Sequence, residues 1–346
     1  MLSLCYNTRM SEIFKPFSTT GIGSLPHRSA EDACELVLGA FDIPFWPQLP
    51  QISFREQMIP QYSEGMPFIR MNEKEETIWV LRDDSDQLER FYESCAGDSR
   101  IAISEDYAFG LHRFLELIRG RRFPLLKGHV TGPMTFTLGL KDNFGRLIYF
   151  DEELREISCM LLQAKARWQI DMLKQHADNV IIFIDEPILS ALGSSAYLGV
   201  DENETLRLLK DMVSAIEGAG GIPGIHCCGR TDWPLVLRTG IKILNFDAFE
   251  YFSTIAMYPE EVGAFLQSGG YLAWGAVPTS DVINTVDDEG LSTLMRSNLE
   301  KLSDHVGAQA VCSRILLTPA CGAGSRTIPE AVRIFQLVMR LKETFT

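Results

Sequence analysis

The chain has 346 residues, of which 46 % are hydrophobic, so it is long enough to bury a large core. Its 32 basic and 46 acidic residues give a formal net charge of −14, which argues against nucleic acid as a partner, because phosphates require a basic surface. No stretch approaches the roughly 18 to 20 apolar residues of a membrane span, and no signal peptide is evident at the start. We therefore expect a cytoplasmic protein that binds neither nucleic acid nor membrane.

Residues 1–17 are expected to form a disordered lead-in to a single domain, 18–346. From residue 19 onward, short apolar runs alternate with amphipathic segments of helical period. Eight runs are predicted to be strands: 19–24, 43–47, 125–130, 180–185, 222–228, 243–247, 271–277 and 315–321. Helices are predicted over 152–175, 204–217, 259–267, 291–305 and 329–342. This alternation predicts an α/β fold, a single (β/α)8 TIM barrel.

One segment interrupts the alternation. Residues 47–80 are rich in proline, glutamine, aromatic and charged residues and have no helical period. We interpret them as an excursion inserted after the second strand, such as a hairpin or a lid over the site.

Residues that can carry chemistry follow several predicted strands, and the C-terminal strand ends are where barrels of this type place their active sites. Ser24 offers a hydroxyl after a glycine-rich run, which could also be a simple turn. His129 is predicted to belong to the core or to lie behind the site. Asp185 and Glu186 end another run, where a carboxylate could hold a substrate ammonium group or cap a helix.

Three residues form a predicted zinc site. His226 and Cys228 are two apart on a strand, so their side chains face the same side, and Cys321 ends another apolar run. Three protein ligands with a replaceable fourth position are typical of catalytic zinc, whereas structural sites usually have four. Each residue alone would more often be an ordinary buried side chain, but the set at matched strand ends favours a metal site.

Five other cysteines show no such spacing, and a long chain of this class is expected to keep its cysteines reduced. These five are interpreted as core or incidental residues: Cys5, Cys34, Cys95, Cys159 and Cys312. An oxygen ligand of modest strength would leave easily when a substrate thiolate arrives, so the fourth zinc ligand is predicted to be a carboxylate. Asp247 and Glu250 are both suitable, and their chemistry alone does not decide between them.

The motifs together resemble the catalytic C-terminal domain of cobalamin-independent methionine synthase, in the uroporphyrinogen decarboxylase and methionine synthase barrel superfamily. The resemblance runs from about residue 19 to the end of the chain. The matching motifs are Ile22-Gly-Ser, Thr131-Gly-Pro, Asp185-Glu-Pro, His226-Cys-Cys and Pro319-Ala-Cys-Gly. It implies a zinc ion that activates homocysteine, with ligand roles for His226, Cys228 and Cys321. The family's glutamate corresponds to Glu250 by count and to Asp247 by its position at a strand end, and we favour Asp247.

The resemblance also implies a place for the amino-acid substrate. Ser24 and the backbone at Ile22 match the segment that holds the substrate carboxylate, and Asp185 matches the acid that holds its ammonium group. Two departures concern the methyl donor: no histidine follows the seventh strand, and the family's N-terminal half, which helps bind folate, is absent. We therefore expect a zinc-dependent methyltransferase that makes methionine from homocysteine with a non-folate donor, such as a methylated corrinoid protein.

Three alternatives remain open. The acceptor could be another thiol, such as coenzyme M. A metal-free decarboxylase acting on a porphyrinogen shares the barrel, but it would need basic residues aimed at propionates, for which only Arg70 and Arg230 come into consideration. A zinc-binding module without catalysis would leave Ser24 and Asp185 without a purpose.

Overall fold

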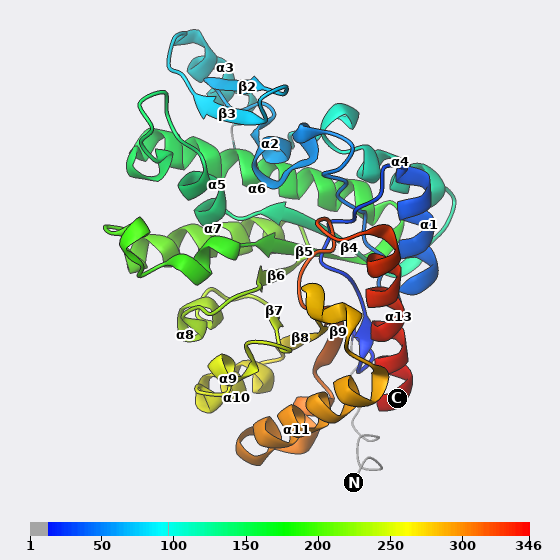
Figure 1. The fold of residues 1–346 in the computed structure, drawn as a ribbon. Helices are drawn as coiled ribbons and strands as arrows, with labels where there is room; N and C mark the ends of the chain where they lie inside the picture. The colour runs from blue at the N-terminus through cyan, green and yellow to red at the C-terminus, as the bar shows by residue number, and fades with distance from the viewer. Residues whose placement is uncertain (1–12, 96) are drawn as a thin grey trace.

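The computed structural model describes residues 13–95 and 97–346, and its centre is a curved parallel sheet (Figure 1). Seven strands form this sheet in the order β1-β9-β8-β7-β6-β5-β4, and each pairs with its neighbours in parallel. The strands are β1 Ser18–Thr19, β4 Phe123–Thr131, β5 Ala177–Asp185, β6 Ile222–Cys227, β7 Ile243–Asp247, β8 Tyr271–Val277 and β9 Ile315–Pro319. The α/β class and the parallel sheet are thus as predicted.

The eighth predicted strand, 43–47, is not a strand of this sheet, so the count of eight is not confirmed. The segment nevertheless bonds to both edges of the sheet. Ile43 N–H donates to Thr19 O at 3.0 Å, and Lys127 N–H donates to Pro44 O at 2.9 Å. Isolated parallel bridges join Phe45 to Lys127 and Ser24 to Gln48. Residues 43–48 therefore lie between β1 and β4.

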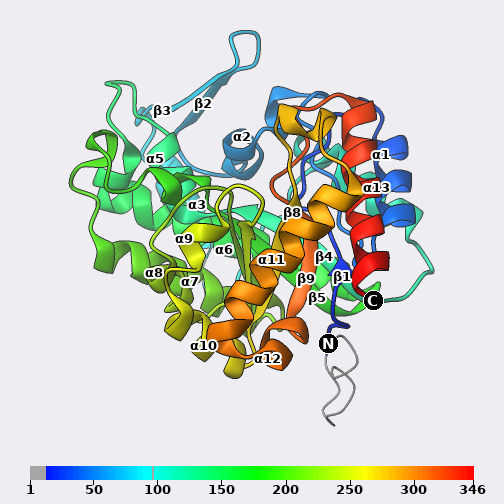
Figure 2. The same ribbon diagram turned by 60° about the horizontal axis from the view of Figure 1, so that its bottom comes forward.

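Helices surround the outside of the sheet, as Figures 1 and 2 show. The longer ones are α1 Ala30–Ala40, α3 Asp86–Ser94, α4 Phe109–Leu117, α6 Glu152–Lys174, α7 Glu202–Gly218, α10 Pro259–Gln267, α11 Asp288–Val306 and α13 Ile328–Phe345. The shorter ones are α2 Met58–Ser63, α5 Pro133–Gly139, α8 Trp233–Leu237, α9 Phe252–Ile255 and α12 Ala308–Cys312. All five predicted helices are present. Four of them begin at a capping side chain that satisfies the first backbone N–H groups, such as Asp151 for α6, and α10 begins at Pro259 without one.

The inner face of the sheet is layered. One cluster on this face is apolar and buried: Phe14, Ile22, Ile43, Leu125, Ile181, Phe183, Ile243, Tyr271, Ala273 and Leu316. Because alternate residues of a strand face the same side, the next inward positions include the buried polar residues Lys127, Asn245 and Thr318. Along these strands, polar inward-facing residues thus follow the apolar ones in the direction of the strand ends that carry the predicted site.

The predicted lead-in, 1–17, lies mostly outside the described residues, of which only 13–17 belong to it. Phe14 is buried, with its ring centroid 4.7 Å from that of Tyr271, and Phe17 is buried as well. The boundary of the domain at residue 18 stays a prediction.

The predicted excursion, 47–80, contains the short 3₁₀ turn Phe54–Glu56, helix α2 and an antiparallel hairpin of β2 Ile69–Asn72 and β3 Thr77–Val80 (Figure 1). Its base is fixed by Glu56, a buried carboxylate that accepts hydrogen bonds of 2.7 Å from the N–H groups of Leu49 and Phe109. Whether the segment is an insertion that moves over the site stays a prediction. Among the described helices, none is long and apolar enough to cross a membrane.

Candidate metal and substrate site

The three predicted metal ligands lie together at the C-terminal edge of the sheet. His226 belongs to β6, Cys228 follows that strand directly, and Cys321 follows β9. One ligand atom from each lies within 4.8 Å of the other two, and Cys321 Sγ is 3.8 Å from His226 Nε2. The strand-end spacing seen in the sequence therefore corresponds to a compact nitrogen and sulfur cluster.

The electrostatics of this cluster favour a thiolate. A hydrogen bond from Cys321 and the presence of His226 lower the pKa of the Cys228 thiol to about 4, although burial opposes this. The same hydrogen bond and burial raise the pKa of Cys321 well above its ordinary value. One imidazole and two thiol groups, largely shielded from solvent, are a donor set that suits zinc. The residues present thus fit the metal that the motifs imply.

His226 is held from behind by a residue that the sequence analysis did not single out. Its Nδ1 atom forms a hydrogen bond with Oδ1 of Asn245, a fully buried residue of β7. The available signal was a polar residue inside the apolar run Ile243-Leu-Asn-Phe. A polar group at such a position must find a buried partner, because burial without a hydrogen bond is costly.

The two proposed carboxylate ligands differ in placement. Asp247 ends β7 and is buried, and its Oδ1 accepts hydrogen bonds of 2.9 Å from the N–H groups of Phe249 and Glu250. Burial raises the pKa of Asp247 to about 6, and the nearby Cys228 adds to this rise. Glu250 is exposed and accepts a 3.3 Å hydrogen bond from Ser280. Neither carboxylate completes the compact cluster of the described residues, so the fourth ligand stays a prediction.

Asp185 ends β5, next to the metal cluster, because β5 and β6 are paired with Asp185 opposite His226. Its side chain is buried, and its Oδ1 atom has no hydrogen-bond partner within the described protein. Burial raises the pKa of Asp185 to about 6, while His226 and Lys127 limit this rise. A buried carboxylate oxygen without a partner is costly, which makes it a natural contact for a ligand.

Glu186, the second acid of this motif, contacts helix α5. Its Oε1 accepts a 2.9 Å hydrogen bond from Met134 N–H, and its Oε2 accepts hydrogen bonds of 2.7 and 2.6 Å from the N–H and hydroxyl of Thr135. Burial raises the pKa of Glu186 to about 7. Gly132 allows this approach, since a Cβ there would lie 2.2 Å from the carboxyl group. Of the two roles considered for this motif, Glu186 thus has the helix-capping one, and a role in substrate binding stays a prediction.

Ser24 and Ile22 approach the site from β1. Ser24 Oγ accepts a 3.3 Å hydrogen bond from Gly324 N–H, and Ser24 O accepts one of 2.9 Å from Ala323 N–H. The Ser24 side chain therefore packs against the loop that follows Cys321. Ile22 O accepts a hydrogen bond from Nζ of the buried Lys127. The predicted role of this segment in binding a substrate carboxylate is untested.

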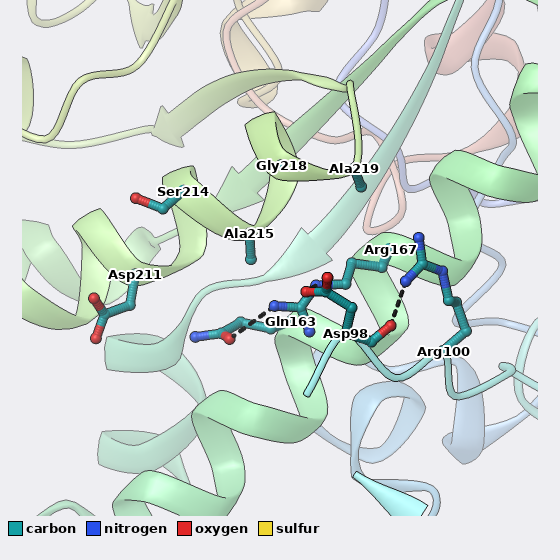
Figure 3. A pocket seen from close by; sticks show the side chains of 9 residues that line it. All are labelled: Asp98, Arg100, Gln163, Arg167, Asp211, Ser214, Ala215, Gly218 and Ala219. Carbon is teal, nitrogen blue, oxygen red and sulfur yellow. Dashed lines mark hydrogen bonds and ion pairs between the residues drawn. The ribbon is translucent and has the colours of Figure 1, made fainter. Parts of the chain in front are cut away.

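A cavity of about 410 Å³ lies elsewhere, outside the sheet between residues 98–100 and helices α6 and α7 (Figure 3). Its two arginines already have acidic partners: Arg100 Nε lies 2.6 Å from Asp171, and Arg167 Nε lies 3.9 Å from Asp98. None of the predicted site residues lines this cavity.

Comparison with known proteins supports the fold. No protein-family model matches the chain, and no curated protein matches it in sequence. A B12-independent methionine synthase from Shewanella sp. W3-18-1, solved in complex with selenomethionine, is similar with a TM-score of 0.60 and 15 % identity over 95 % of this chain and 97 % of that chain. A methyltransferase from Methanosarcina mazei is similar with a TM-score of 0.58 and 16 % identity over 98 % and 96 %. The chain shares their fold. The predicted resemblance to methionine synthase is thus confirmed at the level of the fold.

Proposed function

We propose that the protein is a zinc-dependent methyltransferase that converts homocysteine to methionine. The observation that carries the proposal is the cluster of His226, Cys228 and Cys321 beside the unpartnered carboxylate oxygen of Asp185. A soft metal site next to a buried anion suits a substrate that has both a thiol and an ammonium group. The similar fold of a methionine synthase that binds selenomethionine supports the same class of substrate.

His226 Nε2 and the two thiolates of Cys228 and Cys321 would hold the zinc ion, with Asp247 as the favoured fourth ligand. Zinc at this site supplies a Lewis acid that lowers the pKa of a thiol, so that a thiolate is available at neutral pH. Asp247 would hold the ion through an oxygen, a weaker ligand for zinc than the two thiolates, which suits a catalytic rather than a structural site. Residues 43–48, which bond to both edges of the sheet, take the place of the eighth barrel strand in this proposal.

The chain's own residues orient the amino acid. Asp185 Oδ1 binds the substrate ammonium group, and Ser24 with the backbone at Ile22 binds the carboxylate. The homocysteine sulfur then forms a bond to the methyl carbon, while the bond between that carbon and the donor breaks and its electron pair stays with the donor. The thiol proton leaves to solvent. Fixing the sulfur and the amino-acid end together aligns the attack, which supplies much of the rate in such transfers.

The proposed donor is a methylated corrinoid carried by a partner protein. A folate donor fits less well, because β8 ends in Ala276 and Val277 without a histidine for proton handling. Homocysteine is favoured over coenzyme M as acceptor. Coenzyme M has a sulfonate in place of an amino-acid group, and a sulfonate would lie against the buried Asp185 carboxylate without an ammonium group to neutralise it.

The zinc content of the purified protein tests the proposal. We expect about one zinc per chain, lost in Cys228→Ala and retained in Cys227→Ala, which removes a neighbouring thiol that points to Gly229 O. With methylcobalamin as a model donor, methionine should form from homocysteine in the parent and in Cys227→Ala only. A parent protein without zinc, or a Cys228→Ala variant with full methyl-transfer activity, would refute the proposal.

A further inference from the structure

A row of hydrogen bonds crosses the inside of the sheet directly below the metal cluster. It starts at Nδ1 of His226 on β6 and passes to Oδ1 of Asn245 on β7. The Asn245 side-chain nitrogen continues it at 2.8 Å to Ala273 O on β8 and at 2.8 Å to Thr318 Oγ1 on β9. All four residues are buried, so no solvent competes for these bonds.

The row determines which way the Asn245 amide points. Ala273 O is a backbone carbonyl, which can only accept a hydrogen bond, so the group facing it must be the amide NH₂. The amide oxygen then faces His226, and an amide oxygen also only accepts. Nδ1 of His226 must therefore carry a hydrogen, and in the neutral ring the lone pair lies on Nε2. Nε2 is the atom 3.8 Å from Cys321 Sγ.

The layout of the strands allows one side chain to make all three contacts. Sheet pairing places Asn245 beside His226 on one side and beside Ala273 on the other. Ala273 has a small side chain, so Asn245 can reach past β8 to Thr318. Thr318 is three residues before Cys321 on the same chain segment. The amide thus joins the two segments that carry all three metal ligands, His226 and Cys228 on one and Cys321 on the other.

We propose that Asn245 is a positioning residue that holds His226 as the Nδ1-protonated tautomer, with Nε2 presented to the metal. Thr318 and Ala273 O fix the amide in the required orientation. Partners of this kind orient metal-binding histidines and raise metal affinity by roughly 10 to 100-fold. The inference rests on the proposed function for the presence of a metal, but the tautomer of His226 can be observed in metal-free protein.

The first test needs no substitution. In metal-free protein labelled with ¹⁵N-histidine, at a pH where the imidazole is neutral, the His226 spectrum should show the hydrogen on Nδ1. A spectrum with the hydrogen on Nε2 would overturn the inference. The His226→Gln variant identifies the signal among the six histidines of the chain.

The second test measures zinc affinity by competition with a chelator. Asn245→Leu removes the acceptor and should raise the zinc dissociation constant by about 10 to 100-fold, whereas Asn245→Asp keeps an oxygen acceptor and should recover most of that loss. Thr318→Val should have a smaller effect, because Ala273 O still orients the amide. Asn298→Leu, at a buried asparagine of α11, is the matched control and should bind zinc like the parent.

The outcomes separate the two proposals. If Asn245→Leu is folded and binds zinc as tightly as the parent, Asn245 does not position the ligand. If the parent binds no zinc, the proposed function fails, while the tautomer spectrum still decides the role of Asn245.

Discussion

Gly275 lies where three strands meet beneath the site, and a single methyl group there should disturb both the fold and the metal cluster. A Cβ at this position would lie 2.5 Å from Phe246 O, 2.9 Å from Ala320 Cα and 3.2 Å from Asp247 Cα. All three are backbone atoms of the neighbouring chain segments, so no side-chain rotation can relieve the contacts. Gly275→Ala therefore requires the backbone to move.

The size of the effect follows from these distances. Non-bonded carbon contacts are favourable at about 3.5 to 4.0 Å, so the neighbouring backbone must shift by roughly an ångström. Overpacking of this kind costs about 1 to 3 kcal/mol, and the upper end applies because the affected segments are buried strand ends. Asp247 belongs to one of them, and Cys321 directly follows Ala320. We therefore expect zinc affinity to fall by about tenfold or more, as it does when the support of a ligand is lost.

Urea unfolding and chelator competition measure the two effects. Gly263→Ala in α10 is the matched control, because a Cβ there would meet only the methyl groups of Val306 at 3.7 Å. That substitution should leave zinc affinity unchanged and stabilise the fold by about 0.5 to 1 kcal/mol, since alanine favours a helix. Equal unfolding midpoints and zinc affinities for the two variants would refute the tight packing argued for Gly275.

Three further substitutions test separate parts of the structure. Glu186→Ala should lower the free energy of unfolding, measured with urea, by about 2 to 6 kcal/mol. Two buried N–H groups of α5 lose their acceptor in this variant, at a cost of about 1 to 3 kcal/mol each. Weaker homocysteine binding at unchanged stability would instead indicate that Glu186 contacts the substrate. Asp185→Asn should raise the KM for homocysteine about 10 to 100-fold at constant zinc content, and an unchanged KM would remove its assigned role. Thr327→Ala breaks the capping box that Thr327 forms with Glu330 at the start of α13. The variant should lose about 0.5 to 2 kcal/mol of stability and keep its zinc content. An unchanged urea midpoint would contradict this prediction.

The strands could be predicted from sequence because strands covered on both faces appear as continuous apolar runs. The predicted bounds of β7 and β8, 243–247 and 271–277, agree with the structure. Two predictions differ from the structure: the predicted strand 19–24 overlaps β1 only at Thr19, and the run 43–47 forms no strand of the sheet. The run 43–47 contains Pro44 and Pro47, which have no N–H to donate, so the segment forms single bridges to both sheet edges instead of a continuous ladder.

The site divides in the same way, into features set by local spacing and features set by sheet register. His226 and Cys228 could be paired from sequence because a two-residue spacing places both side chains on one face of a strand. The partners of Asn245 could not, because Thr318 is 73 residues away and the register of β7, β8 and β9 decides which residues meet. A polar residue inside an apolar strand indicates that it has a buried hydrogen-bond partner, but only the register of the sheet identifies that partner.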